Sequence, residues 1–310
     1  MTYELLILLL LVALIFVSCN KTPGLQGGQA LGRSLQHYHR HALLDPKHIC
    51  LGCHEKCTTT LHEHLSSFGL SMTRSNAIAD PTSFSVWPSN GRVTVLDQGP
   101  WGSCTAYSMR YAYLIYLNRM NPTAPLVEPS VAFWYAQSRL GLNLRPLYDS
   151  GSTITATVNV LSQYGAPTNA QWPYTSTNVF AVPPTSFSNP SLTKITVPMR
   201  IPNLSGTTGT NWQAQSAAIQ ASIASGRSVM LAIYVYANFM TKNVFISGVV
   251  PMPSGSLLGG HAITLVGYNS VTKVFQFYNS WGTYTGQNGL FTIPYQYVGN
   301  GKYAGEWWQF

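Results

Sequence analysis

The spacing of apolar residues predicts helices, then strands, in the region that follows residue 80. Residues 103–119 carry apolar and aromatic side chains on most faces and contain no Gly or Pro, which predicts a buried helix. Residues 152–165 and 213–226 are predicted as two further helices, each ending at a glycine. From about residue 229, short apolar runs separated by turn residues predict strands in VMLAIYVY, HAITLVGY, KVFQFYNSW and GLFTIP. This order favours an α+β architecture with two lobes.

A longer apolar run opens the chain, at residues 5–17. Its length suits the apolar part of a signal peptide better than a full membrane span, which needs about 20 residues. Residues 1–19 are therefore interpreted as a signal peptide or a membrane anchor, and we expect a membrane-anchored or exported protein. The first basic residues follow this run, which favours the cytoplasmic side for the rest of the chain, so the side of the membrane stays open.

Residues 20–80 combine a Gly- and Gln-rich linker with a segment rich in Cys and His. Seven of the eight histidines lie in residues 37–64. A Cys-x-x-Cys pair is a common half-site for zinc because both thiolates can face one ion, so the candidate zinc ligands are Cys50, Cys53, His54 and Cys57. Disulfides, a c-type haem attached at CLGCH and a solvated His-rich tract are alternatives that the pattern leaves open. We expect a zinc-binding targeting, docking or regulatory module, and an inhibitory propeptide is a further interpretation.

The composition indicates a compact globular protein with few charges. Charged residues make up 8% of the chain and aromatic residues 12%, which is not the balance of a disordered chain. The net charge is +8, and residues 81–310 carry eleven Lys and Arg against four Asp and Glu. These basic residues are scattered singly, so the sequence does not favour a nucleic-acid partner. We expect a monomer.

Residues 81–310 contain one cysteine and one histidine, Cys104 and His261. Cys104 lies at the start of the helix predicted at 103–119, where unpaired N–H groups and the helix dipole lower the pKa of a thiol. A thiolate catalyst needs a proton acceptor, which His261 can supply, and an imidazole needs an orienting group, for which Asn279 in NSWG is suited. Packing roles for these residues are the simpler alternative. Their combination favours nucleophilic catalysis.

Three segments carry a family resemblance. QGPWGSCTAYS, GGHAITLVGY and YNSWGTYTGQNGLFTIPY resemble, in this order, the cysteine, histidine and asparagine segments of papain-like cysteine peptidases. The resemblance covers residues 81–305 of the chain. It implies the two-lobe papain fold, with a helical N-terminal lobe, a β-rich, barrel-like C-terminal lobe and the active-site cleft between them. Residues 81–310 are therefore expected to form a peptidase domain.

The resemblance also implies roles for individual residues. Cys104 matches the nucleophile, His261 the general base and acid, and Asn279 the residue that orients His261. Gln98 matches the side-chain donor of the oxyanion hole, which is aimed at charge that appears only in the tetrahedral intermediate. Trp281 matches the indole that shields the Asn–His pair from water.

A second stretch, YDSGSTITATVNVLSQYGAPTNAQWPY, resembles the family segment that follows the substrate-binding strand. Gly151 and Ser152 are therefore expected along the cleft wall, where a peptide substrate pairs through its backbone. Trp101 stands where the family usually has a disulfide cysteine, so the domain is expected to fold without an internal disulfide. No histidine lies in residues 65–260, which argues against a His-bearing carboxydipeptidase loop and favours an endopeptidase.

The resulting prediction is a cysteine endopeptidase that cleaves polypeptides through a Cys–His–Asn triad and a thioester acyl-enzyme. Its catalysis needs no cofactor. Two alternatives stay open. One is a binding or structural protein that keeps the fold without the activity, because fold does not guarantee function. The other is an enzyme with the same triad in which an amine, instead of water, resolves the thioester.

Overall fold

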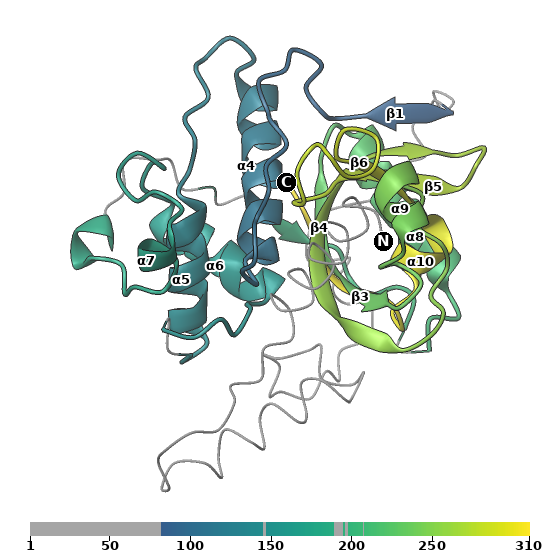
Figure 1. Cartoon of the computed structure of the whole chain (residues 1–310). Helices are drawn as coiled ribbons and strands as arrows, with labels where there is room; N and C mark the ends of the chain where they lie inside the picture. Colours follow the sequence, from purple (N-terminus) through teal and green to yellow (C-terminus); the bar gives the residue numbers. More distant parts are fainter. Residues whose placement is uncertain (1–81, 145–146, 189–194, 196–197, 207) are drawn as a thin grey trace, which may run out of the picture. The chain divides into compact units, whose positions relative to one another are not determined.

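A group of helices packed beside an antiparallel sheet makes up the part of the chain that the structure describes (Figure 1). The computed structural model describes residues 82–310, apart from 145–146, 189–194, 196–197 and 207. The apolar N-terminal run and the four predicted zinc ligands lie outside these residues. Among the helices that are described, none is long and apolar enough to cross a membrane.

The helical lobe is built around α4 (Cys104–Met120), which confirms the helix predicted at residues 103–119. All of its first twelve residues are buried, as expected for a helix with apolar residues on most faces. The elements around it are α5 (Val131–Gly141), α6 (Ile154–Tyr164), α7 (Ser176–Val179) and the 3-10 helix η2 (Thr185–Ser188). The hydroxyls of Ser130 and Thr153 cap α5 and α6 by accepting the N–H groups of Phe133 and Ala156.

The second lobe contains a sheet in the order β2-β7-β3-β4-β5-β6, with β1 paired to β4. Every pair of these strands is antiparallel. The strands are β1 (Ser83–Ser85), β2 (Met199–Arg200), β3 (Val229–Tyr236), β4 (Leu257–Asn269), β5 (Val274–Tyr278), β6 (Leu290–Pro294) and β7 (Ala304–Gln309). The helices of this lobe are α8 (Trp212–Ala224), α9 (Lys242–Ser247) and α10 (Tyr295–Gly299).

The predicted strands are confirmed as β3 to β6, and the predicted third helix as α8. The expected barrel-like closure is not formed: among the described residues no pairing joins β6 back to β2, so the sheet is open. The lobes also do not divide the sequence at one point. β1 precedes α4 in the sequence yet pairs with β4 in the sheet, and the terminal Phe310 is buried in the core of the helical lobe.

The two lobes meet where α4 packs on β4. Ala262 and Val266 of β4 belong to the core around α4, whereas Ile263 and Leu265 belong to the core inside the sheet lobe. This alternation follows from the two-residue period of a strand that is covered on both faces. The hydroxyl of Thr264 donates to the carbonyl oxygen of Ser108 in α4 at 2.7 Å, which ties the two lobes one helical turn beyond Cys104.

Candidate active site

Cys104 and His261 line one cavity of about 150 Å³ between α4 and the sheet. The cavity wall also includes the predicted substrate-binding residues, Gly151 and Ser152. Glu306 of β7 is the one acidic residue in the lining. The described residues hold no group of three or more Cys, His, Asp or Glu side chains placed to bind a metal ion.

The thiol of Cys104 lies at the first position of α4. It is the one cysteine in the described part of the chain and forms no disulfide. Ser103 precedes the helix without capping it, because its hydroxyl shares a 2.5 Å hydrogen bond with the hydroxyl of Tyr174. Cys104 is 7% exposed, so a negative charge on its sulfur would lie in a largely dry site at the positive end of the helix dipole.

His261 and Asn279 form a hydrogen bond that fixes the tautomer of the imidazole. Oδ1 of Asn279 accepts the backbone N–H of Ser280 at 2.9 Å, which identifies this atom as the amide oxygen. Nε2 of His261 lies 2.9 Å from the same oxygen and must therefore carry the proton. In the neutral ring, Nδ1 is then the nitrogen that can accept a proton.

Burial determines the charge of His261. The side chain is 3% exposed, and its ring is stacked on the indole of Trp281, with 5.0 Å between ring centroids and 26° between planes. Trp281 is itself stacked on Phe245 and buried. Desolvation lowers the pKa of His261 to about 4, although the hydrogen bond to Asn279 opposes this shift. The resting imidazole is therefore neutral near pH 7 and able to act as a base.

The side chain of Gln98 is buried and held at both ends of its amide. Oε1 accepts the hydroxyl of Ser280 at 2.6 Å, and Nε2 donates to the carbonyl oxygen of Trp101 at 2.8 Å. An amide nitrogen carries two protons. Among the described residues the second Nε2 proton makes no hydrogen bond, so it is the one that could donate to a bound group. The hydroxyl of Tyr174 donates to the Gln98 carbonyl oxygen at 2.8 Å and holds the same segment.

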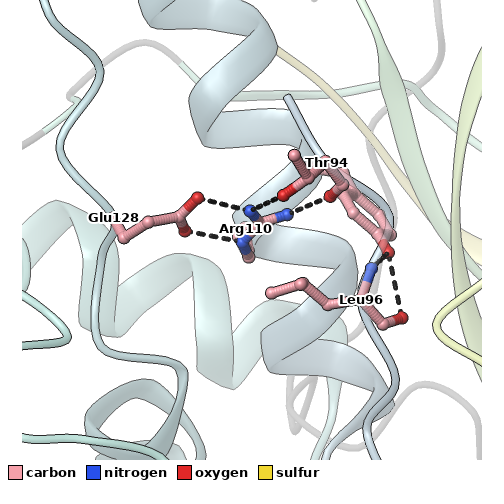
Figure 2. Close-up of polar contacts among 5 residues, drawn as sticks. Thr94, Leu96, Arg110 and Glu128 are labelled. Carbon is pink, nitrogen blue, oxygen red and sulfur yellow. Dashed lines mark hydrogen bonds and ion pairs between the residues drawn. The ribbon is translucent and has the colours of Figure 1, made fainter. Parts of the chain in front are cut away.

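The segment that leads to Gln98 is fastened to α4 by a buried arginine, as Figure 2 shows. Nε of Arg110 donates to Glu128 at 2.8 Å, and Nη1 donates to the carbonyl oxygen of Thr94 at 2.8 Å. Arg110 is fully buried while Glu128 is half exposed. The backbone N–H of Leu96 donates to the hydroxyl of the neighbouring Tyr111 at 3.1 Å. These bonds fix the backbone two residues before Gln98.

The sequence interpretation did not identify two of the residues at this site, Asp149 and Glu306. Asp149 accepts the backbone N–H of Gly102, and Glu306 accepts the N–H and hydroxyl of Thr155 at 2.8 and 2.7 Å. Burial raises the pKa of Glu306. A signal was present, because residues 81–310 contain four acidic residues and each is therefore notable. Their partners are far away in sequence and become visible in the fold alone.

Comparison with known proteins identifies the family of the chain. The sequence model of the family described as "Papain family cysteine protease" matches residues 149–304, which include His261 and Asn279. An uncharacterized peptidase C1-like protein of Acanthamoeba polyphaga mimivirus is 28% identical over 215 residues, covering 69% of this chain and 68% of the relative. The chain belongs to the papain family of cysteine proteases.

Further similarities fit this membership. A cathepsin B-like protein of Giardia intestinalis is 27% identical over 205 residues, covering 64% of this chain and 63% of that protein. The structure of xylellain, a cysteine protease from Xylella fastidiosa, superposes with a TM-score of 0.64 at 27% identity, covering 74% of this chain and 86% of that one. A stem bromelain precursor shares the fold at 20% identity and a TM-score of 0.55, covering 74% of this chain and 70% of the precursor. This papain-family protein is therefore a peptidase, and polypeptides are its class of substrate.

Proposed function

We propose that this papain-family protein is a cysteine endopeptidase in which Cys104 is the nucleophile, His261 the general base and acid, and Asn279 the residue that orients His261. The observation that carries the proposal is the arrangement around one cavity. The thiol at the start of α4 and the imidazole of β4 line the same space, and the imidazole is held through Nε2 so that Nδ1 is its basic nitrogen. The peptidase domain is proposed to be residues 81–310.

The reaction begins with proton transfer. Nδ1 of neutral His261 takes the proton of the Cys104 thiol, and the resulting thiolate attacks the carbonyl carbon of the scissile peptide bond. The carbonyl oxygen becomes an oxyanion. The second N–H of Gln98 and the backbone N–H of Cys104 are proposed as its donors, and such donors stabilise charge that develops only in the transition state.

The intermediate then collapses. The C–N bond breaks while protonated His261 gives its proton to the leaving amine, and the acyl group stays on the sulfur as a thioester. A water molecule, deprotonated by the same imidazole, attacks the thioester carbon and releases the carboxylic acid and the free thiol. Trp281 excludes other water from the His261–Asn279 hydrogen bond by covering the ring face.

The proposals for the first eighty residues remain distinct from this site. We propose that residues 1–19 direct the chain to a membrane or export pathway, and that residues 37–64 bind one zinc ion. Metal analysis of the purified full chain should give about one equivalent of zinc, in line with a four-ligand site. Well under one equivalent would contradict the zinc proposal and leave the peptidase proposal untouched.

Steady-state hydrolysis of a peptide whose scissile bond lies away from both ends tests the proposed function. We expect turnover by the wild type and none above background in Cys104→Ala. Adding a small primary amine separates hydrolysis from transfer, because both start from the same thioester. A product that is mainly the free acid supports the peptidase, and a product that is mainly the amide at low amine concentration would contradict it. No turnover of any peptide by a folded wild type would favour the non-catalytic alternative.

A further inference from the structure

The carboxylate of Asp149 joins two walls of the cavity. Its Oδ1 and Oδ2 accept the backbone N–H of Gly102 at 2.9 and 3.1 Å. The hydroxyl of Tyr135 donates to Oδ1 and also accepts the backbone N–H of Gly151 at 3.2 Å. Gly102 precedes Cys104 by two residues, and both Gly102 and Gly151 line the cavity. One carboxylate therefore links the nucleophile segment to the predicted substrate-binding wall.

Buried groups hold this link in place. Tyr135 of α5 is fully buried, and the guanidinium carbon of Arg139 lies 3.9 Å from the centre of its ring. Arg139 also donates to the carbonyl oxygens of Tyr148 and Val179, which fixes the backbone next to Asp149. Burial, and then the nearby charge of Asp149, raise the pKa of Tyr135 well above its usual value, so its hydroxyl stays a donor at neutral pH. Hydrogen bonds to an ionised carboxylate are roughly twice as strong as neutral ones.

In the described part of the chain no disulfide joins these two segments. Cys104 is its one cysteine and forms no disulfide, and Trp101 stands where papain-like peptidases usually have a disulfide cysteine. The next residue, Gly102, is the one that Asp149 holds. The other contacts of the segment from Gln98 to Cys104 with this side of the lobe include hydrogen bonds to Tyr174 and the packing of Trp101 against Phe180.

We propose that Asp149 is a positioning residue for peptide cleavage. Its carboxylate sets the Gly102 amide, and with it Cys104, at a fixed distance from the Gly151 wall, and Tyr135 extends the hold to the backbone of Gly151. The segment that carries the nucleophile and the wall that binds the substrate then keep a constant distance from each other. This inference rests on the proposed role of Cys104 as nucleophile.

Four variants of the full chain test it: Asp149→Ala, Asp149→Asn, Tyr135→Phe and, as a matched control, Tyr297→Phe. Tyr297 is a buried tyrosine whose hydroxyl donates to the carbonyl oxygen of Tyr234 in the sheet lobe, outside the cavity. For each variant we would measure kcat and KM for a peptide and the rate at which iodoacetamide alkylates Cys104. Alkylation reports the nucleophile segment alone, whereas KM also reports the substrate wall.

Tyr135→Phe should raise KM about tenfold with alkylation changed less than about twofold, because it releases the wall and leaves Gly102 bound. Asp149→Ala should lower kcat between about 10- and 100-fold and slow alkylation, because both walls are released. Asp149→Asn keeps an acceptor for Gly102 and should recover most of the alkylation rate. Tyr297→Phe should leave all three quantities near those of the wild type.

Two results would overturn the inference. One is a folded Asp149→Ala enzyme with wild-type kcat and KM. The other is equal losses in Tyr135→Phe and Tyr297→Phe, which would show a general effect of lost stability. If Asp149→Ala does not fold, kcat, KM and the alkylation rate of Asp149→Asn and Tyr135→Phe are compared with those of Tyr297→Phe. Values equal to those of Tyr297→Phe would then contradict the inference. A wild type that cleaves no peptide would instead contradict the proposed function.

Discussion

Among single residues, His261 is deeply buried, although the proposed reaction requires its imidazole to take up a proton. Burial would be costly for a charged imidazole, so the ring is kept neutral, and Asn279 holds its proton on Nε2. The proposed general base is thus set by its surroundings before any substrate arrives. The cost of this arrangement appears in the pH dependence of folding.

The protein should lose stability as the pH falls from about 6.5 to about 4. In this window the unfolded chain protonates His261 and the folded chain does not, so protons favour unfolding, while above the window the contribution is fully present. The difference is at most about 3 kcal/mol for a shift of this size. Urea unfolding near neutral pH and near pH 4.5, for the wild type and His261→Gln, measures it. An equal loss on acidification in both proteins would show that His261 does not titrate in this way.

Residue chemistry could be predicted from the sequence where a residue type was rare. One cysteine and one histidine in residues 81–310 made Cys104 and His261 conspicuous, and the structure places both at one cavity. Their catalytic roles stay a prediction. Asp149 is one of four acidic residues in residues 81–310, but its rarity does not indicate its role, which depends on contacts with Gly102 and Tyr135, 47 and 14 residues away in sequence.

Among the elements, α4 carries Cys104 at its first position and, through Arg110, makes hydrogen bonds to two other segments. The bonds of Arg110 to Glu128 and Thr94 hold the segment that leads to Gln98, so a residue in the second turn of the helix positions a residue in another segment (Figure 2). Two charges and several backbone groups share this small region. Removing one partner leaves the others without their bonds.

Arg110→Ala should therefore destabilise the fold by about 2–4 kcal/mol, because it leaves a cavity and removes the donor to the Thr94 carbonyl oxygen, while the half-exposed Glu128 can turn to water. The matched control is Arg92→Ala, because Arg92 also bonds a side chain, that of Asn118, but lies nearer the surface, where such a loss costs at most about 1 kcal/mol. Chemical denaturation of both variants measures the difference. A loss for Arg110→Ala no larger than that for Arg92→Ala would contradict the structural role given to this network.

The elements that could be predicted are those with a strong local pattern. β3 is a run of eight apolar residues and was predicted with its observed bounds. α5 ends at Gly141 but was not predicted, because its polar residues Ser138 and Arg139 are buried along with the apolar ones and no apolar stripe marks one face. β1 and β2 have three and two residues, too few to show any period, and they are strands only because β4 and β7 offer partners.

For the whole molecule, the site depends on how the two lobes are joined. Cys104 belongs to the helical lobe and His261 to the sheet lobe, so their separation follows from the packing of α4 on β4. Thr264 makes a side-chain hydrogen bond across this contact. Apolar packing alone has no direction, whereas this bond fixes the position of the strand along the helix.

Thr264→Val tests this connection, with Thr157→Val as its control. Each variant keeps the shape of a buried threonine and removes one hydroxyl that donates to a carbonyl oxygen, that of Ser108 or of Thr153. Both should lose about 1–2 kcal/mol of stability. Thr264→Val alone should slow peptide hydrolysis, because Thr157 bonds within one helix and Thr264 bonds between lobes. Equal rates of hydrolysis in the two variants would contradict the proposed coupling.

The central claim is that His261 activates Cys104 for attack on a carbonyl group. The most direct test is labelling with an epoxysuccinyl peptide, mapped by mass spectrometry, on the intact chain and on a form trimmed near residue 80. Wild type, Cys104→Ala and His261→Ala would be compared, each shown to be folded by circular dichroism. We predict one adduct, on Cys104, formed at least about 100-fold more slowly without His261. No adduct on Cys104 in either folded form, or an equal rate without His261, would contradict the account.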